Sequence, residues 1–335
     1  MTPRPRRFRI LPWRWFGAAL MGVCLAGVDP TTGQAQQLPD STFSPLVSSP
    51  QWAPGAGPVL CLDEGHHNFH TLANRFLAFG RLAARDGFVV RPLRARFTRA
   101  ALNSCRLLVI ANAQPNDKPW ERYPVPTPSA FAADEITAIR EWIAGGRSLL
   151  LLADHQPLAG AAASLAAALG FRFTDGFALP RFASAAARDA SVPGGTLFRQ
   201  EDGTLVHHPV VLGRTDQERV TRVRSFTGQA FHALDSGSTT IQAVMRLPDD
   251  YVLLQPRIAW QFTDSTPQRP VGGWLQGATN RIGRGRVAVF GEAAMFSAQV
   301  QGAARRPMGM NAPMAEQNAQ FVLNVLHWLL GVLDP

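Results

Sequence analysis

Five short apolar runs, separated by segments with helical spacing, constrain the fold of this chain more than any other feature. The runs are PVLCL, FVVRPL, RLLVIAN, SLLLLAD and RVAVFGEAA, and they begin at residues 58, 88, 106, 148 and 286. Continuous apolar strands that alternate with helices are typical of a parallel sheet that is covered on both faces. We therefore predict an α/β fold with a doubly wound, mainly parallel, flavodoxin- or amidotransferase-like sheet.

The pattern changes between about residues 201 and 280. Strand-like pieces such as RVTRVRSF, TTIQAVMRL and YVLLQ replace the alternation of strand and helix there. We interpret this part as a mostly antiparallel, β-rich insertion or extension of the sheet. The run RVAVFGEAA then restores the parallel pattern, and two helices are expected to close the chain. A single α/β domain over residues 58–332, with this insertion, is the expected organisation.

A targeting segment precedes the domain. Five of the first 14 residues are arginine, and FGAALMGVCLAGV follows as an apolar run shorter than the roughly 20 residues that span a bilayer. We predict a signal peptide over residues 1–35, with an uncleaved membrane anchor as the alternative. Residues 36–57, rich in Pro, Ser, Gly and Gln, are expected to form a flexible linker. The mature protein is then exported, periplasmic or extracellular, with no stable membrane anchor after cleavage.

The charge of the chain does not favour nucleic acid as a partner. The net charge of +9 falls to about +5 when the five Arg and one Asp of the signal peptide are removed. The remaining basic residues are not clustered among aromatic ones, as they are in nucleic-acid-binding surfaces. We therefore expect the partner to be a small polar ligand or substrate rather than DNA or RNA.

Two cysteines, Cys61 and Cys105, remain in the mature chain. An oxidising compartment permits a disulfide between them. Both residues also lie in or beside apolar strands, so two buried thiols are equally compatible with the sequence. Neither belongs to a CxxC motif, and a thiolate zinc site is therefore not expected.

Titratable and polar residues gather where the apolar runs end. The first run continues into DEGHHNFHT, the fourth into DHQ, and the last into GE. Ligands of doubly wound sheets bind outside the carboxyl ends of the strands, so we expect these groups to share one crevice. Its expected members are Asp63, Glu64, His66, His67, Asn68, His70, Asn112, Asp154, His155, Gln156 and Glu292.

These side chains suggest metal-assisted or acid–base chemistry. The candidate ligands of a divalent metal such as zinc are His66, His67, His70 and Asp154, because imidazole nitrogen and carboxylate oxygen suit that ion. The candidate catalytic acids and bases are Asp63, Glu64, His155 and Glu292. We also expect His70 to lie near a helix N-terminus, which would favour its neutral form.

Five further assignments concern ligand binding. Asn68, Asn112 and Gln156 are candidate ligand-binding groups at the strand ends. Arg214 and Gln229 would join them if the β-rich insertion folds back over the crevice, and Arg214 would then meet a carboxylate in a bidentate pair. The alternative is that the glycines beside these two residues only permit turns within the insertion.

Several of these stretches carry a resemblance to a known family. They are DEGHHNFHT, HPVVLGR, SFTGQAF, GRGRVAVFGEAAMFSAQ and NAQFVLNVLHWL. Over residues 58–330 the chain resembles an uncharacterised bacterial domain family related to the gliding-motility transporter accessory proteins and the intraflagellar-transport proteins. That family looks like the class I glutamine amidotransferase superfamily in fold. The resemblance implies the fold and no particular reaction.

Two classes of function follow from these observations. We expect a hydrolase, metal-assisted or acting by general acid and base, on a small polar or envelope-derived substrate. The alternative is a non-catalytic module of the cell envelope. Such a module would bind a small molecule or carbohydrate, or act as a transporter-accessory or assembly protein with an envelope partner. A Cys-dependent glutamine amidotransferase is not expected, because the turn after SLLLLAD has no cysteine to act as nucleophile.

Overall fold

The structure is a computed structural model that describes residue 1 and residues 37–182, 195–235 and 240–333. The predicted signal peptide lies outside the described residues. Residues from Ala35 onward form one compact unit. Among the residues described, no helix is both long enough and apolar enough to cross a membrane.

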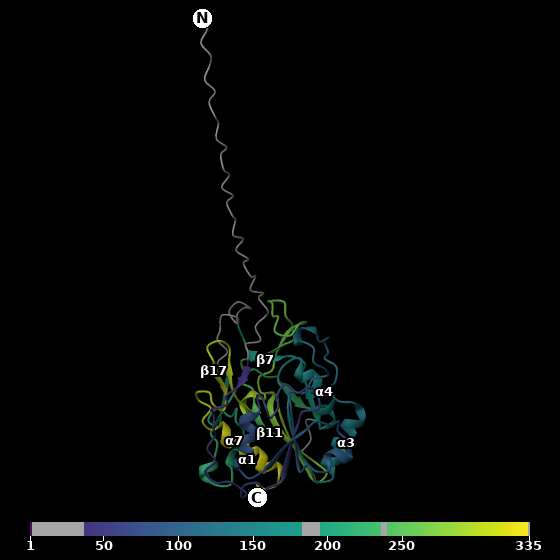
Figure 1. Cartoon of the computed structure of the whole chain (residues 1–335), viewed down its shortest axis with the longest axis vertical. Coiled ribbons are helices and arrows are strands. Elements are labelled where there is room, and N and C mark those ends of the chain that lie inside the picture. Colours follow the sequence, from purple (N-terminus) through teal and green to yellow (C-terminus); the bar gives the residue numbers. More distant parts are fainter. Residues whose placement is uncertain (2–36, 183–194, 236–239, 334–335) are drawn as a thin grey trace. The chain divides into compact units, whose positions relative to one another are not determined.

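A nine-stranded sheet forms the centre of the domain (Figure 1). Five neighbouring strands are parallel, in the spatial order β3 (Val89–Leu93), β2 (Val59–Asp63), β4 (Leu107–Ala111), β5 (Ser148–Leu152) and β15 (Gly285–Phe290). Numbered along the chain, these strands have the order 2-1-3-4-5 of flavodoxin-like folds. The α/β class and the doubly wound arrangement expected from the sequence are therefore confirmed.

The β-rich region adds antiparallel strands to the same sheet. These are β14 (Leu275–Ile282), β11 (Gln242–Arg246), β10 (Phe231–Ala233) and, from an earlier part of the chain, β6 (Phe171–Phe173). Strands β14 and β15 form a hairpin that joins the two halves of the sheet. Much of the expected insertion is thus an extension of the central sheet.

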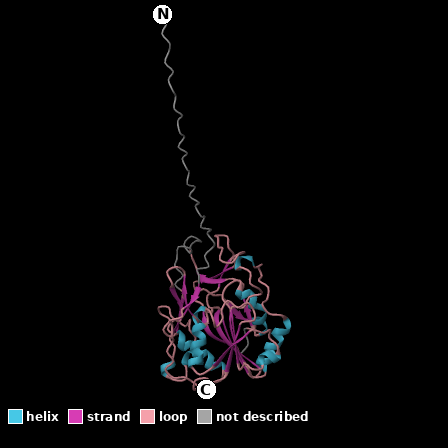
Figure 2. Ribbon diagram, viewed as in Figure 1, coloured by secondary structure: helices cyan, strands magenta, loops and turns pink. Residues whose placement is uncertain are grey.

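Helices cover both faces of the sheet, as Figure 2 shows. One face carries α1 (Leu77–Arg85) and α7 (Asn318–Leu329); the other carries α2 (Arg99–Leu102), α3 (Ala133–Ala144) and α4 (Leu158–Ala168). Because successive strand residues point to opposite faces, Leu60 and Leu62 pack with α1 whereas Cys61 packs on the other side. This double burial explains why the parallel strands are continuous apolar runs.

A disulfide joins Cys61 in β2 to Cys105, just before β4. Their Cα atoms are 5.7 Å apart, within the usual range for a bridge. The sequence left open whether these cysteines are bridged or free, and the structure has the bridge.

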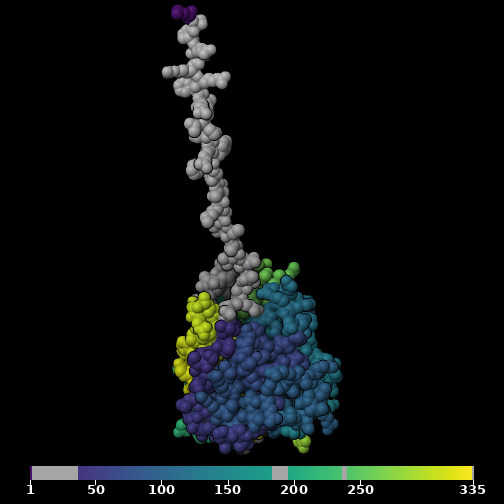
Figure 3. Space-filling view, viewed as in Figure 1, coloured from purple at the N-terminus to yellow at the C-terminus, as the bar shows by residue number. Residues whose placement is uncertain are grey.

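The segment expected to be a flexible linker is instead docked on the domain. Strand β1 (Gln37–Pro39) pairs with β16 (Ala298–Gln301), which pairs in turn with β17 (Arg306–Gly309). Figure 3 shows purple residues from the start of the described chain beside yellow residues near its end. Trp52 packs its ring against Phe88 at 4.9 Å between centroids. The linker prediction is wrong from residue 37 because backbone pairing and this indole hold the segment.

The remaining elements are short and lie in the connections. They are β7 (Phe177–Pro180), β12 (Tyr251–Leu254), β13 (Gln268–Pro270), β8 (Thr196–Arg199), β9 (Arg222–Ser225), α6 (Pro209–Leu212), and the 3₁₀ turns η1 (Trp120–Arg122), η2 (Asp216–Glu218) and η3 (Ala294–Phe296). After β15 the chain forms η3 and the β16–β17 hairpin before α7, where two helices were expected.

Candidate functional site

The expected residues meet at the carboxyl ends of the central parallel strands. Asp63 is the last residue of β2, and Asn112 follows β4 directly. Asp154 and Glu292 each lie two residues beyond their strands, β5 and β15. These four strands are neighbours in the sheet, so their ends converge on one edge, as the sequence predicted.

The first polar group is centred on His66, which lies between two carboxylates. Its Nδ1 is 2.9 Å from Asp63 Oδ1, and its Nε2 is 3.1 Å from Glu135 Oε1 in the first turn of α3. The rings of Phe97 and Phe131 enclose it, with centroids 4.3 and 5.0 Å away. With a carboxylate on each nitrogen, His66 ties the loop after β2 to the start of α3.

This environment favours the protonated imidazole. Burial alone would lower the pKa of His66, but the hydrogen bonds and charges of Asp63 and Glu135 outweigh it and raise the pKa above 6.5. Burial likewise opposes the ionised form of Glu135, yet backbone donors and His66 keep the pKa of that carboxyl below its usual value. His66 is therefore protonated more readily than a free imidazole, and its two carboxylate partners hold two loops together.

We expect the contribution of His66 to stability to depend on pH. In the unfolded chain its pKa is about 6.5, and in the fold it is higher. The stabilisation is therefore complete below about pH 6.5 and is lost as the pH rises through the folded-state value. Replacing His66 with Gln should lower the free energy of unfolding more at pH 6 than at pH 9, as measured by urea titration. Exposed His207 supplies the control His207→Gln, and an equal loss for His66→Gln at both pH values would contradict the assignment.

The second polar group is centred on Asn112, whose φ of 51° is one that asparagine tolerates. Its Oδ1 accepts from the backbone N–H of Asp154 at 2.9 Å, which fixes the orientation of the amide. Its Nδ2 therefore donates to Asp154 Oδ2 at 2.8 Å and to His70 Nδ1 at 3.0 Å. His70 consequently carries its proton on Nε2, which faces the side chain of Gln299 in β16.

His70 is neutral, but for a different reason from the one expected. Helix α1 begins only at Leu77, seven residues beyond His70 along the chain, although the ring of its N-cap residue Phe76 lies 4.7 Å from that of His70 between centroids. Burial is the main cause that lowers the pKa of His70 well below its usual value, and the charge of Arg75 adds to it. The expected helix start near residue 69 is wrong, because residues 64–76 form the loop that carries the polar groups.

Asp154 and Glu292 form a pair of buried acids. Burial raises the pKa of Asp154 to about 7, although Asn112 and the backbone N–H of Ala293 bind its ionised form. Burial and the charge of Asp154 raise the pKa of Glu292 well above its ordinary value. The oxygens of Glu292 accept from the backbone N–H groups of Ala294 and Met295 at 2.5 and 2.9 Å. The pair holds the turn after β15, and Asp154 titrates near neutrality.

His155 lies beside this pair in an aromatic environment. Its ring stacks on Phe177 with centroids 4.4 Å apart, and Trp120 and Trp260 approach edge-on at 5.6 and 4.6 Å. Nδ1 lies 2.7 Å from the carbonyl oxygen of Gln156 and must donate to it, so Nε2 carries the lone pair. No hydrogen-bond partner for Nε2 occurs in the part of the chain that is described. Burial lowers the pKa of His155 to about 4, and the ring is a neutral acceptor.

An aromatic cover closes the strand ends in this structure. Only 8% of Asp154 and 5% of His155 is exposed. The cover comprises Phe69, Trp120, Tyr123, Leu158, Phe177, Leu179, Val252, Leu254, Ala259 and Phe262. Trp260, in the connection between β12 and β13, is 42% exposed and has a φ of 68°, a strained conformation for a bulky residue. It is the part of the covering loop that faces both His155 and solvent.

The structure places three other expected site residues in local supporting roles. Glu64 accepts from the backbone of Leu72 and pairs with Arg94. Asn68 donates to Asp63 Oδ2 at 2.9 Å. Gln229 donates to the carbonyl of Ala153 at 3.0 Å.

Gln156, by contrast, is buried without a complete set of hydrogen bonds. No partner for its side-chain oxygen occurs among the described residues. Such an atom is either bound by an ordered water or available to a ligand.

Arg214 does not lie at the strand ends. It pairs with Glu218, and its remaining donors bind Gln51 and the carbonyl of Ser49. Gln51 in turn donates to Asp86 at the end of α1, beside the amino ends of the strands. The ligand-binding role expected for Arg214 is therefore wrong, because the segment around it packs at the opposite edge of the sheet.

The expected metal ligands do not form one coordination set. His66 uses both nitrogens on carboxylates, His70 and Asp154 are bound through Asn112, and His67 lies half-exposed against Asp117 at 2.6 Å. Among the described residues, no three His, Cys, Asp or Glu side chains are arranged to hold a metal ion. The predicted metal ligands His66, His67, His70 and Asp154 therefore do not surround one site but lie in three separate places.

The most important residues that sequence reasoning missed are Glu135, Gln299 and Trp260. Glu135 follows Asp134 at the start of α3, where acids are explained by the helix dipole alone. Gln299 comes from a hairpin near the C-terminus, and Trp260 from a loop without regular structure. No spacing in the sequence connects these residues with the strand ends.

Comparison with solved structures agrees with this architecture. The structure entitled "mmIFT52 N-terminal domain" aligns with a TM-score of 0.54 and 12% identity, over 81% of this chain and 97% of that one. A putative ThuA-like protein from Bacteroides uniformis and a cytoplasmic protein from Salmonella typhimurium each align with a TM-score of 0.44 and 12% identity, covering 85% and 81% of this chain and 93% and 98% of theirs. No protein-family model and no curated protein matches the sequence. The likeness to the mmIFT52 N-terminal domain shows a shared α/β fold and nothing about activity.

Proposed function

We propose that the chain is a non-catalytic binding module of the cell envelope. The observation that carries this proposal is the use made of the strand-end carboxylates. Asp63, Asp154 and Glu292 each accept hydrogen bonds on both oxygens, from backbone N–H groups or from neighbouring side chains. Groups employed in this way fix loops, and a rigid set of loops is the usual basis of a binding face.

The binding face would be the aromatic region around His155. Its Nε2 is an acceptor for a ligand hydroxyl, and Trp260 offers partly exposed indole surface beside it. An acceptor next to an aromatic face suits a small polar ligand with one apolar side, such as a sugar ring. Access requires the loop that carries Trp260 to move, and its strained φ is consistent with such a loop.

Export is part of the same proposal. The disulfide between Cys61 and Cys105 would persist in an oxidising compartment such as the periplasm, which supports the predicted signal peptide. Membership in the family related to gliding-motility transporter accessory proteins is likewise proposed, on the quoted sequence stretches and the shared fold. An envelope protein partner would fit that membership.

A hydrolase is the second candidate, and one observation favours it. The pKa of Asp154 is about 7, so this acid could gain and lose a proton at neutral pH. His155 beside it is a neutral base. Together they could act as general acid and base on a ligand at the same face, with no metal required.

Thermal unfolding with a panel of mono- and disaccharides would test the proposal. A sugar at about 100 times its Kd stabilises its protein by about 2.7 kcal/mol, so the melting temperature should rise, and mass spectrometry should recover the sugar unchanged. Trp260→Ala and His155→Gln should abolish the rise. The controls Leu46→Ala and His207→Gln replace exposed residues elsewhere and should not.

The same assay separates the two candidates. Release of product that stops in Asp154→Asn, with the fold retained, would replace the binding module with the hydrolase. If no sugar in the panel raises the melting temperature, the proposed ligand class is wrong.

A further inference from the structure

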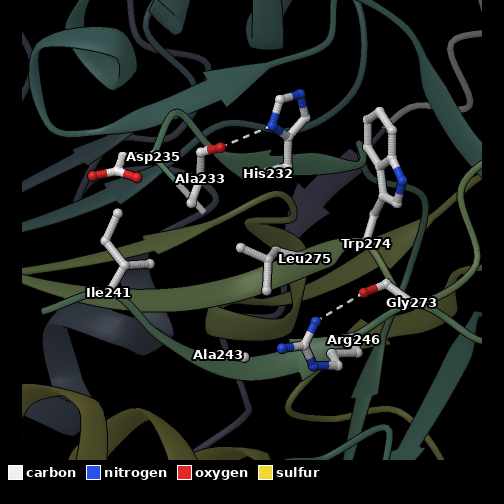
Figure 4. Close-up of a pocket in the computed structure, with 9 residues that line it drawn as sticks. All are labelled: His232, Ala233, Asp235, Ile241, Ala243, Arg246, Gly273, Trp274 and Leu275. Atoms are coloured by element: carbon white, nitrogen blue, oxygen red, sulfur yellow. Dashed lines mark hydrogen bonds between the residues drawn. The ribbon is translucent and has the colours of Figure 1, made fainter. Parts of the chain in front are cut away.

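A cavity of about 270 Å³ lies away from the candidate site, on the antiparallel part of the sheet. Strands β10, β11 and β14, together with the residues flanking them, line it (Figure 4). Its lining residues are His232, Ala233, Asp235, Ile241, Ala243, Arg246, Gly273, Trp274 and Leu275. Leu275 packs in the core on the α3 and α4 side of the sheet. Its neighbour Gln276 points the other way and binds Ser225 beside Glu292, so the cavity and the strand-end site are distinct.

The floor of the cavity is apolar. Leu275 lies in its centre in Figure 4, with Ile241 and Ala243 beside it. These side chains belong to neighbouring antiparallel strands, since Ala243 pairs with Ala278 and Arg246 with Leu275. A ligand with a hydrocarbon body would therefore remove this apolar surface from contact with water, which favours binding.

The guanidinium of Arg246 lies at one side of this apolar floor. Arg246 donates from Nη1 to the carbonyl of Gly273 at 3.0 Å, which holds the guanidinium beside the cavity. Its Nε and Nη2 make no hydrogen bond among the residues described. A second guanidinium, of Arg269, lies 4.9 Å from the ring centroid of Trp274. Arg246, the one arginine among the described residues that line the cavity, favours a negatively charged ligand group, and its planar fork suits a carboxylate.

An acceptor in the lining limits the ligand further. His232 Nδ1 lies 2.9 Å from the carbonyl of Ala233 and donates to it, so Nε2 carries a lone pair. The ring stands edge-on to Trp274 at 4.9 Å. Figure 4 shows Asp235 across the floor from Arg246. A ligand with one carboxylate matches the single arginine found among the lining residues that the structure describes.

We propose that this cavity binds a small monocarboxylate with an apolar body and one hydroxyl or amine group. The carboxylate pairs with Arg246, the apolar body covers Leu275 and Ile241, and the hydroxyl or amine donates to His232 Nε2. A volume of about 270 Å³ is slightly below the range of about 300–1,000 Å³ usual for ligand pockets. The class is therefore that of hydroxy and amino acids with a single side chain.

Isothermal titration calorimetry with 3-phenyllactate, 3-phenylpropanoate and 3-phenylpropanamide tests this site. The first has the carboxylate and the hydroxyl, the second lacks the hydroxyl, and the third also lacks the charge. We expect affinity to fall in that order, with a loss of roughly tenfold or more from the acid to the amide. Arg246→Gln should reduce the affinity for both acids by a similar factor and leave that for the amide unchanged.

Arg91→Gln is the matched control, because it removes the same exposed charge from β3 at the other edge of the sheet. It should bind all three probes as the unmodified protein does. Equal affinity for acid and amide, or an equal effect of Arg246→Gln and Arg91→Gln, would overturn the proposal. Failure of 3-phenyllactate to bind at millimolar concentration would overturn it as well. These probes do not report on the sugar site at His155, so the two proposals fail separately.

Discussion

Removing the bridge between Cys61 and Cys105 is expected to lower the free energy of unfolding by about 4 kcal/mol. The bridge closes a loop of 44 residues, and the chain-entropy relation for a loop of that length gives about 4 kcal/mol at 25 °C. Its site is fully packed, with Cys61 3% and Cys105 0% exposed, so the native state would gain little by relaxing. The effect is large beside the 5–15 kcal/mol total stability of typical domains.

Urea unfolding of the oxidised and the reduced protein measures this difference without removing any side chain. The variant with both Cys61→Ala and Cys105→Ala should unfold at still lower urea concentration, because it also loses buried volume. Ser104→Ala, beside the bridge, is the control and should remain close to the unmodified protein. Equal midpoints for the oxidised and reduced forms would show that the loop is already constrained in the unfolded chain.

Breaking the pair between Asp86 and His327 is expected to cost about 3–5 kcal/mol, the usual penalty for leaving one member of a buried pair without its partner. Both side chains are fully buried, and His327 Nε2 lies 2.7 Å from Asp86 Oδ2. Asp86 Oδ1 also accepts from the backbone N–H of Gln51 at 2.8 Å. Asp86→Ala therefore removes the anchor of α7 and of the N-terminal segment together.

Denaturant unfolding of three variants separates the contributions. Asp134→Asn breaks an ion pair with Arg96 in which both side chains are mostly exposed, and it should cost no more than about 1 kcal/mol. Replacing Asp86 and His327 together with leucine should cost less than Asp86→Ala, because no imidazole is then left buried without its partner, whereas the backbone N–H of Gln51 loses its acceptor in both variants. If Asp86→Ala costs no more than Asp134→Asn, the buried pair does not stabilise the fold.

The parallel half of the sheet could be predicted strand by strand, whereas for the antiparallel half only the antiparallel character could be predicted, and not which strands pair. Strands buried on both faces must be apolar throughout. The five apolar runs could therefore be recognised in the sequence, and they indicated the α/β class. Most strands of the β-rich region are short, with the eight-residue β14 as the exception, and three of them, β10, β11 and β14, extend the central sheet. Tertiary packing decides which strands pair with them, and the local periodicity of the sequence does not predict that packing.

The gathering of polar side chains at the strand ends could also be predicted, because it follows from the direction of the strands alone. The hydrogen-bond partner of each side chain could not be predicted. The position of Asn112 between Asp154 and His70 depends on a φ of 51°, and the second carboxylate on His66 comes from Glu135, 69 residues away. Arg214 was misplaced because its turn is remote from any strand whose direction is known.

The pairing of β1 with β16 bears on the order in which the chain folds. Gln37 lies opposite Gln301, so β1 finds its partner only after the residues between them have been synthesised. Contacts of such long sequence separation form late and slowly. Until β16 has been synthesised, the leading segment offers an unpaired strand edge. A chaperone or protease that binds the growing chain would meet it in that state.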